Sequence, residues 1–347
     1  MKVLVVRFSS LGDVVLSTAF VHCLKKIYPD ASVTYVTKCK YKDVIEDSPF
    51  VDRIVCLEED ESVISLVRKM RRERFDIVFD LHSSLRSKIF SLLIKKRRYL
   101  HVCKHTLFRL SLIKRNRVLR LFSVRKPSGG VIEWQLSLLG IQNKRVFPRL
   151  FVDKDVEKSV SEMIDKHFKH RFLVGFAPDS RWKTKMWGTD KYSALAERIL
   201  SWNKDAVLFL FGEDREIGDE IEAVCPRRIY NLMGRLTIKE VMALISFMNL
   251  FVSNDSGLMH IANAFRIPLV AIFGPTVPDF GFCPRGEEVR IAEVDLPCRP
   301  CSLHGTDVCK ENYQCMKMVP VDDVFDKVKE VSQYANQHSC SSVSSYK

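Results

Sequence analysis

The stretch LFVSNDSGLMHIANAFRIPLVAIFGPT, residues 250–276, shows how the chain is built. The run LFVSN has the continuous apolar character of a buried parallel strand. GLMHIANAF predicts a helix, and PLVAIFGPT predicts another strand, which we expect to be the last. Such a succession builds a parallel sheet covered by helices. It leaves the question of why a tight polar turn, Asp255, Ser256 and Gly257, separates the first strand from the helix.

The same alternation runs through both halves of the chain. KVLVVRF, SVTYVT, RIVCL and FDIVFDLH predict strands of a first sheet; RFLVGFAP, AVLFLFG and RIYNLMG predict strands that precede LFVSN in a second. We therefore predict an α/β protein of two Rossmann-like domains, with a cleft between their parallel sheets. The expected domains are residues 1–160 and 161–325, joined near 151–170. Residues 326–347 should form a helix and a disordered tail.

The positive charge is concentrated in one region. The 347-residue chain carries a formal net charge of +13, and its composition is 46% apolar. Between Asp80 and Glu133 there are 14 Lys and Arg and no acidic residue, including KKRR at 95–98 and KRNR at 114–117, so the rest is nearly neutral. This interval, with a helix expected near KHTLFRLSLIKR, should attract nucleic acid, anionic lipid or a phosphorylated substrate. The plain alternative is a solvated basic face.

The sequence also indicates in which cellular compartment the protein is located. We find no secretory signal and no long uncharged apolar run, and so expect a cytosolic protein without a membrane span. The eleven cysteines should then be mostly reduced. Cys23, Cys56 and Cys225 lie in apolar patterns and are expected to be core residues.

Two turns lie where open parallel sheets bind ligands, beyond the carboxyl ends of strands: SSLGD at 9–13 and NDSGL at 254–258. In the second, Asp255 or Ser256 suits a helix N-cap, and the backbone N–H groups that follow form a site for phosphate. A capped helix without a ligand is the alternative. Neither turn matches the P-loop motif GxxxxGK[ST]. Neither matches GxGxxG either, and this disfavours binding of a nicotinamide dinucleotide. The arrangement suits a transferase that holds a nucleotide donor in one domain and an acceptor in the other.

At this point the sequence resembles glycosyltransferase family 9, the lipopolysaccharide heptosyltransferases. The resemblance rests on VLVVRFSSLGDVVLSTAF, KMWGTDKYSALAERIL, LFLFGEDRE, NLMGRLTIKEVMALISFMNLFVSNDSGLMHIANAFRIPLVAIFGPT and CRPCSLHGTDVCKENYQCM, in family order. It implies the two-domain GT-B fold, inversion of the anomeric centre and an ADP-activated heptose donor.

Asp13 matches the catalytic base of that family. An inverting transfer needs one base to take the proton of the acceptor hydroxyl as it attacks C1 of the donor. A carboxylate in the first turn of a helix is kept ionised by the helix dipole. The alternative is that Asp13 only caps its helix. Ser10, in the same turn, is a tentative acceptor contact.

The resemblance also implies a donor site. Lys185, in KMW, matches the phosphate-binding lysine, which would neutralise charge that develops on the diphosphate. Ser180 matches a hydroxyl near the phosphate, although PDSRW departs from the usual pattern there. Glu216 matches the residue that accepts the ribose hydroxyls, and Leu236 the side chain that packs on adenine. A solvated glutamate and simple core packing are the respective alternatives.

The opening turn then matches the family's diphosphate turn, formed by Asp255, Ser256 and Gly257. Asp255 would repel phosphate if it pointed at the ligand, so we expect it to accept backbone N–H groups and shape the turn. His260, one helical turn along, could reach the phosphate or be structural. We expect no metal and no cofactor besides the donor, ADP-heptose.

Four cysteines, Cys298, Cys301, Cys309 and Cys315, form C-x2-C-x7-C-x5-C. Such a set can bind zinc, although the spacing between the pairs is shorter than in common zinc ribbons. Disulfides and reduced packing stay open as well, because the family shares the cysteines without indicating their role.

The expected function is transfer of heptose from ADP-L-glycero-D-manno-heptose to the lipopolysaccharide inner core, either Kdo-lipid A or its first heptose. That acceptor is phosphorylated and membrane-embedded, which explains a basic acceptor domain. We expect tentative contacts with the acceptor, or with the cytoplasmic side of the anionic inner membrane of a Gram-negative-type bacterium, from Lys95, Lys96, Arg97 and Arg98.

The alternative to an ADP-heptose donor is a different nucleotide sugar. Nucleic-acid binding is disfavoured, because the basic segment has few aromatics and no recognised module. The order of heptose addition and the oligomeric state stay open.

Overall fold

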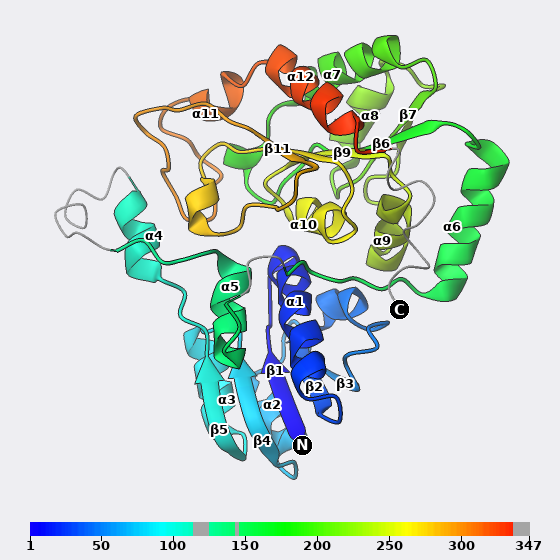
Figure 1. Cartoon of the computed structure of the whole chain (residues 1–347). Coiled ribbons are helices and arrows are strands. Elements are labelled where there is room, and N and C mark those ends of the chain that lie inside the picture. The colour runs from blue at the N-terminus through cyan, green and yellow to red at the C-terminus, as the bar shows by residue number, and fades with distance from the viewer. Residues whose placement is uncertain (114–124, 143–145, 336–347) are drawn as a thin grey trace. The chain divides into compact units, whose positions relative to one another are not determined.

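The computed structural model describes residues 1–113, 125–142 and 146–335, which fall into two compact units (Figure 1). The first consists of Met1–Thr106 and Lys126–Phe151. The second consists of the described residues of Leu107–Arg125 and Val152–Lys347. The predicted joint at 151–170 is mostly helical, since α6 spans Lys154–His167. The domain boundary at residue 160 stays a prediction.

The first unit contains a five-stranded parallel sheet in the order β3-β2-β1-β4-β5. Its strands are β1 (Lys2–Val6), β2 (Ser32–Lys38), β3 (Arg53–Leu57), β4 (Phe75–Asp80) and β5 (Lys96–His101). The central strand is apolar on both faces because it is covered by helices on both, and its residues from Val3 to Val6 have no solvent exposure. The edge strand β5 was not predicted, because its sequence KRRYLH is mostly charged and polar.

Helices cover both faces of this sheet. They are α1 (Leu11–Ile27), α2 (Val63–Met70), α3 (Leu85–Leu93) and α5 (Val131–Leu136), with a 3-10 helix at Cys39–Val44. Side chains alternate between the faces of a strand. Accordingly, Leu4 joins a core with α2 and α3, whereas Phe79 contacts Phe20 of α1 edge-on. α5 packs beside α1, and α2 beside α3.

The second unit contains a six-stranded parallel sheet in the order β11-β10-β9-β6-β7-β8. Its strands are β6 (Phe172–Ala177), β7 (Ala206–Leu210), β8 (Ile229–Asn231), β9 (Leu250–Asn254), β10 (Leu269–Ile272) and β11 (Val289–Ala292). The prediction that the strand near 268–276 is the last is therefore wrong. β11 was missed because it is short, includes Arg290, and is only partly buried.

The helices of the second unit lie before, between and after its strands along the chain. They are α4 (Thr106–Leu112, of which Thr106 clusters with the first unit), α6, α7 (Thr189–Trp202), α8 (Arg215–Glu222), α9 (Ile238–Ser246), α10 (Gly257–Ala264), α11 (Gln314–Lys317) and α12 (Val321–Ser332). α4 confirms the helix expected near KHTLFRLSLIKR, whereas KRNR at 114–117 lies outside the described residues. α12 confirms the helix expected after the second sheet, and it packs against β9, β10 and β11. Among the described helices, none has the length and apolar character needed to cross a bilayer.

Candidate active site

Asp13 lies in the first turn of α1, directly beyond the carboxyl end of β1. Its carboxylate forms an ion pair with the guanidinium of Arg7. The backbone N–H and hydroxyl of Ser10 donate to the Oδ2 atom of Asp13 at 3.1 and 2.9 Å. Arg7 is only 6% exposed and also donates to the carbonyls of Ser9 and Leu81. Asp13 is thus held through Oδ1 by Arg7 and through Oδ2 by Ser10 of its own turn.

These contacts determine the protonation of Asp13. Burial alone raises the pKa of this carboxyl. The charge of Arg7 and the hydrogen bonds from Ser10 and Arg7 outweigh burial and hold the pKa at about 2. Asp13 is therefore ionised at neutral pH, as a base must be. It also completes the capping interaction with Ser10, so the helix-capping alternative and a catalytic role are compatible.

Three polar groups at the ends of the neighbouring strands β1 and β4 were not predicted from the sequence. Arg7 is one. The others are Asp80, which has no solvent exposure, and His82, whose ring lies 5.6 Å from that of Phe8. Burial and the charge of Arg7 lower the pKa of His82 to about 3, so its ring is neutral. The available signal was a charged or polar residue at the end of an apolar strand, in VLVVRF and in FDIVFDLH.

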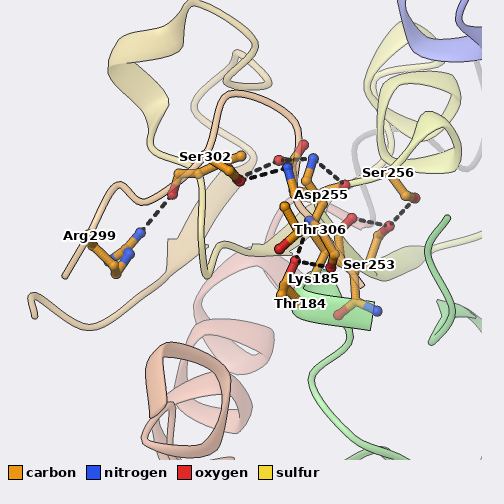
Figure 2. Close-up of polar contacts among 11 residues, drawn as sticks. Thr184, Lys185, Ser253, Asp255, Ser256, Arg299, Ser302 and Thr306 are labelled. Atoms are coloured by element: carbon orange, nitrogen blue, oxygen red, sulfur yellow. Dashed lines mark hydrogen bonds and ion pairs between the residues drawn. The ribbon is translucent and has the colours of Figure 1, made fainter. Parts of the chain in front are cut away.

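Lys185 lies at the end of a 3-10 helix, Lys183–Lys185, in the second unit. Its Nζ atom donates to Oδ2 of Asp255 at 2.6 Å and to the carbonyl of Asp255 at 3.3 Å (Figure 2). Thr276 Oγ1 donates to the same Oδ2 at 2.6 Å. Burial raises the pKa of Asp255, but Lys185 outweighs burial, and the net pKa is lowered. Asp255 is therefore a carboxylate that binds two side chains, which corrects the expectation that it accepts backbone N–H groups.

The turn between β9 and α10 has the predicted form. Ser256 is the N-cap of α10, and its side chain does not cap the helix but lies 3.2 Å, Oγ to Oγ, from Ser253 (Figure 2). Gly257 begins the helix. His260 is 5% exposed, and its charge interaction with Asp255 places it at this turn. The helix N-terminus thus offers backbone donors without a side-chain cap, as an anion site requires.

The remaining donor-site candidates follow strands of the same sheet. Ser180 follows β6, Glu216 follows β7 in the first turn of α8, and Leu236 follows β8. Because all these strands are parallel, the three residues lie at the edge where Asp255 follows β9. Ser180 and Leu236 are partly buried, and Glu216 is exposed. Their contacts with a ligand stay predictions.

Asp179 is a residue of this edge that the sequence did not single out. Its Oδ2 atom accepts the backbone N–H groups of Glu213 and Asp214 at 2.6 and 3.2 Å, and burial raises its pKa. Gly212 allows this approach, because a Cβ there would come within 2.5 Å of the Asp179 carboxylate. Asp179 therefore ties the turn after β6 to the turn after β7, from which Glu216 extends.

The cysteine-rich segment, residues 298–315, contacts the residue that precedes Lys185. Its four cysteines are unbridged and line a cavity of about 250 Å3 together with Thr184. Among the described residues, no three His, Cys, Asp or Glu are placed to hold a metal ion. Thr184 Oγ1 donates to the carbonyl of Thr306 at 2.7 Å and accepts from its N–H at 2.8 Å. Thr184 directly precedes Lys185, so the segment fixes the lysine's backbone (Figure 2).

Arg299 makes a second attachment of the same segment. Its side chain is 4% exposed and donates to the carbonyls of Gly274 and Thr276, the latter at 3.0 Å. It also pairs with Glu293 at 2.7 Å. Because Thr276 binds Asp255, the segment positions both partners of the ion pair.

The tentative acceptor and membrane contacts lie on the first unit. Lys96, Arg97 and Arg98 belong to the edge strand β5, and Lys95 directly precedes it. All except Lys96 are exposed. Within the described part of the chain, these exposed cations form a single long ion pair, 3.7 Å from Arg97 to Asp76, so most of their charge faces solvent.

Two parallel α/β sheets, each with a polar turn and a paired aspartate at its carboxyl edge, are the arrangement expected of the GT-B fold, which the solved heptosyltransferase structures share. The sequence profile of glycosyltransferase family 9 (heptosyltransferase) matches residues 63–311, and the chain belongs to this family. Both the family and the fold predicted from the sequence are thus confirmed, and the protein is a glycosyltransferase.

Individual relatives of the chain are heptosyltransferases. Lipooligosaccharide heptosyltransferase 2 of Haemophilus influenzae is 25% identical over 81% of this chain and 85% of its own length. Lipooligosaccharide heptosyltransferase 2 of Campylobacter jejuni is 23% identical over 96% and 99% of the two chains. The structure of Escherichia coli ADP-heptose lps heptosyltransferase II superimposes with a TM-score of 0.75 at 21% identity, covering 97% of this chain and all of that one.

Proposed function

We propose that this protein transfers heptose from ADP-L-glycero-D-manno-heptose to the inner core of lipopolysaccharide, with inversion at the anomeric carbon. The observation that carries the proposal is Asp13, an ionised aspartate held in a helix turn beyond the central strand of a parallel sheet. Membership of family 9 and the names of the heptosyltransferase relatives support the donor and acceptor classes.

Asp13 acts as the general base in this scheme. The acceptor hydroxyl oxygen attacks C1 of the heptose, the bond from C1 to the diphosphate oxygen breaks, and the hydroxyl proton passes to Asp13. With a pKa of about 2, Asp13 is a weak base toward a free hydroxyl. The proton therefore moves late, when bonding to C1 has made the attacking hydroxyl acidic. Arg7 keeps the carboxylate charged and oriented until that moment.

Lys185 and the α10 turn bind the diphosphate. Backbone N–H groups at the start of α10 donate to phosphate oxygens, and the Lys185 ammonium offsets the charge that grows as the glycosidic bond breaks. Asp255 holds Lys185 in place. Glu216 accepts the ribose hydroxyls and Leu236 packs on adenine. We expect no further cofactor, because ADP is already a stable leaving group.

The acceptor is lipid-anchored and phosphorylated, so the enzyme works at the cytoplasmic surface of the inner membrane. Lys95, Arg97 and Arg98 are exposed on the unit that carries Asp13. They provide cations for acceptor phosphates or anionic lipid, each worth about 1 kcal/mol near such a surface.

The test is turnover with defined substrates. The purified protein would be given ADP-heptose with Kdo-lipid A, or with the acceptor that already bears one heptose. ADP release and product mass would be measured, before and after dialysis against a chelator. We expect one acceptor to be strongly preferred and the chelator to have no effect. Consumption of another nucleotide sugar in place of ADP-heptose would refute the proposal that ADP-heptose is the donor. Loss of activity after treatment with the chelator would refute the expectation that the enzyme needs no metal.

A further inference from the structure

Helix α3 exposes four of its five large apolar residues and buries its serines. Ser87 and Ser91 have no solvent exposure. Four apolar side chains are between 43% and 78% exposed: Leu85, Ile89, Leu92 and Leu93. A helix on the surface of a soluble protein normally has the opposite arrangement, with the apolar stripe toward the core. The exposed stripe of α3 therefore needs an explanation.

Specific contacts fix this orientation. Ser87 Oγ donates to Oδ2 of the fully buried Asp80 at 2.9 Å, and the Ser84 hydroxyl accepts the N–H of Ser87 at 3.1 Å as the N-cap. Phe90, on the same inward side, is fully buried and meets Phe8 edge-on. Rotating the stripe inward would break all of these contacts. The exposure of the apolar side chains is thus built into the unit.

Cations border the stripe on both sides. At about 100° per residue, the four apolar residues span an arc of about 100°, with Lys88 next to one edge and Arg86 next to the other. Both cations are exposed. Arg86 donates to the backbone carbonyl of Glu61, a neutral acceptor, while the carboxylate of Glu61 pairs with Lys69. Among the described residues, neither Arg86 nor Lys88 forms an ion pair with a carboxylate.

We propose that α3 docks on an anionic lipid surface, with its apolar stripe in the boundary between headgroups and acyl chains and its flanking cations on lipid phosphates. The pattern of an apolar arc between basic residues is that of helices that lie in a membrane interface. The proposal rests on the proposed function only in that a lipid-anchored acceptor gives the enzyme a reason to dock.

The docking helix is linked to the catalytic residue through one strand end. β4 ends at Asp80, which binds Ser87 of α3. The next residue, Leu81, accepts a hydrogen bond from Arg7, the partner of Asp13. The proposed lipid-binding helix α3 is therefore attached to the same end of β4 that also positions Asp13 through Arg7.

A lipid surface fits this face better than a second copy of the chain. A twofold interface pairs the same patch with itself, so Arg86 and Lys88 of one copy would approach those of the other. The exposed Lys95 that follows the helix would add to that repulsion. Anionic lipid headgroups instead complement every one of these charges.

The experiment compares the parent with the triple variant Leu85→Gln, Ile89→Gln, Leu92→Gln. All three residues are exposed, so the variant should fold. Ile27→Gln with Met318→Gln, two other apolar residues that are 42% and 50% exposed, is the matched control. Sedimentation would measure binding to phosphatidylcholine vesicles with and without phosphatidylglycerol. Turnover of a delipidated, soluble acceptor and sedimentation-equilibrium mass would be measured in parallel.

We expect the parent and control to bind phosphatidylglycerol vesicles, and the triple variant to bind at least about tenfold more weakly, since exposed glutamines gain nothing from leaving water. Turnover of the soluble acceptor should be unchanged. Parent-like vesicle binding by the variant, or no binding by the parent, would overturn the proposal. So would a parent dimer that the substitutions dissociate, because a second copy would then cover the stripe. If the parent does not turn over any acceptor, the proposed function fails, but the vesicle result still decides the role of α3.

Discussion

The two units each place an ion pair at the carboxyl edge of a parallel sheet, and the pairs differ in which partner carries the chemistry. In the first unit Arg7 holds Asp13, a carboxylate proposed to act on the acceptor. In the second unit Asp255 holds Lys185, an ammonium proposed to act on the donor. The holding partner is the more buried one in each case: Arg7 against Asp13, and Asp255 against Lys185.

The difference shows how the same sheet architecture can present a negative group in one unit and a positive group in the other. A buried ion is tolerated only when it is paired, so each sheet buries the counter-ion and leaves the reactive ion nearer to solvent. The first unit draws both partners from one local segment, six residues apart. The second draws Lys185 and Asp255 from segments 70 residues apart and adds Thr276 from a third. The following substitutions test this assignment.

The largest effect is expected for Asp13→Asn. Loss of a general base lowers turnover by about 10²–10⁴, and the amide keeps the shape of the side chain. ADP affinity, measured by calorimetry, should stay within a few-fold, because the lysine pair is intact. Asp52→Asn, which alters an aspartate paired with Lys25 outside the turn, is the control and should keep near-normal turnover. Near-normal turnover in Asp13→Asn would remove the base assignment.

The next effect is expected for Lys185→Met, which should weaken ADP binding by about 1–3 kcal/mol, the range for a charge-assisted hydrogen bond. Lys183→Met is a matched control, because Lys183 is exposed on the same 3-10 helix. Calorimetry of both variants would decide the matter. Equal losses of affinity in the two would mean that general positive charge, rather than the Asp255 pair, attracts the nucleotide.

A change in pH dependence is expected for Arg7→Met. Without the guanidinium, burial is opposed only by the hydrogen bonds from Ser10, and the pKa of Asp13 should rise from its value of about 2. Because the base must be deprotonated, kcat/KM of the variant should start to fall at a higher pH as the solution is acidified. The parent pair also stabilises the fold above pH 3.8, and this contribution is lost as the pH falls toward 2.

The Arg7→Met profile would be measured only where circular dichroism shows a folded protein. Arg53→Met, which breaks an exposed pair with Glu73 in the same sheet, should keep the parental profile. An acid limb that does not move in the folded Arg7→Met variant would show that Arg7 does not set the pKa of Asp13.

The smallest effect on activity is expected for Thr184→Val. It removes both side-chain bonds to Thr306 and should lower the free energy of unfolding by about 1–3 kcal/mol. ADP affinity should fall only a few-fold, less than in Lys185→Met, since the ammonium itself remains. Thr306→Val is the counterpart, because Thr306 contributes its backbone to this contact, and its own hydroxyl donates only to the exposed carbonyl of Val308. Equal destabilisation by the two variants in thermal unfolding would contradict the described clamp.

Much of the fold and the turns was predictable, because the information is local. Apolar runs predicted nine of the eleven described strands in their order along the chain, and the SSLGD and NDSGL motifs located Asp13 and Ser256 at helix starts. The partners were not predictable. Thr276 meets Asp255 only because β9 and β10 are adjacent, and Asp179 meets Glu213 only because β6 and β7 are. β5 was missed because an edge strand need not be apolar.

That edge strand has a consequence for how the protein behaves at high concentration. β5 presents unpaired backbone groups on one side, and such an edge is a template on which sheets of other copies can grow into aggregates. The cations of KRRYLH keep like edges apart. Replacing Arg97 and Arg98 by alanine would remove this barrier, whereas replacing them by glutamate would preserve it with the opposite sign. Charge reversal is thus the substitution that can report on lipid binding without creating pellets of insoluble protein.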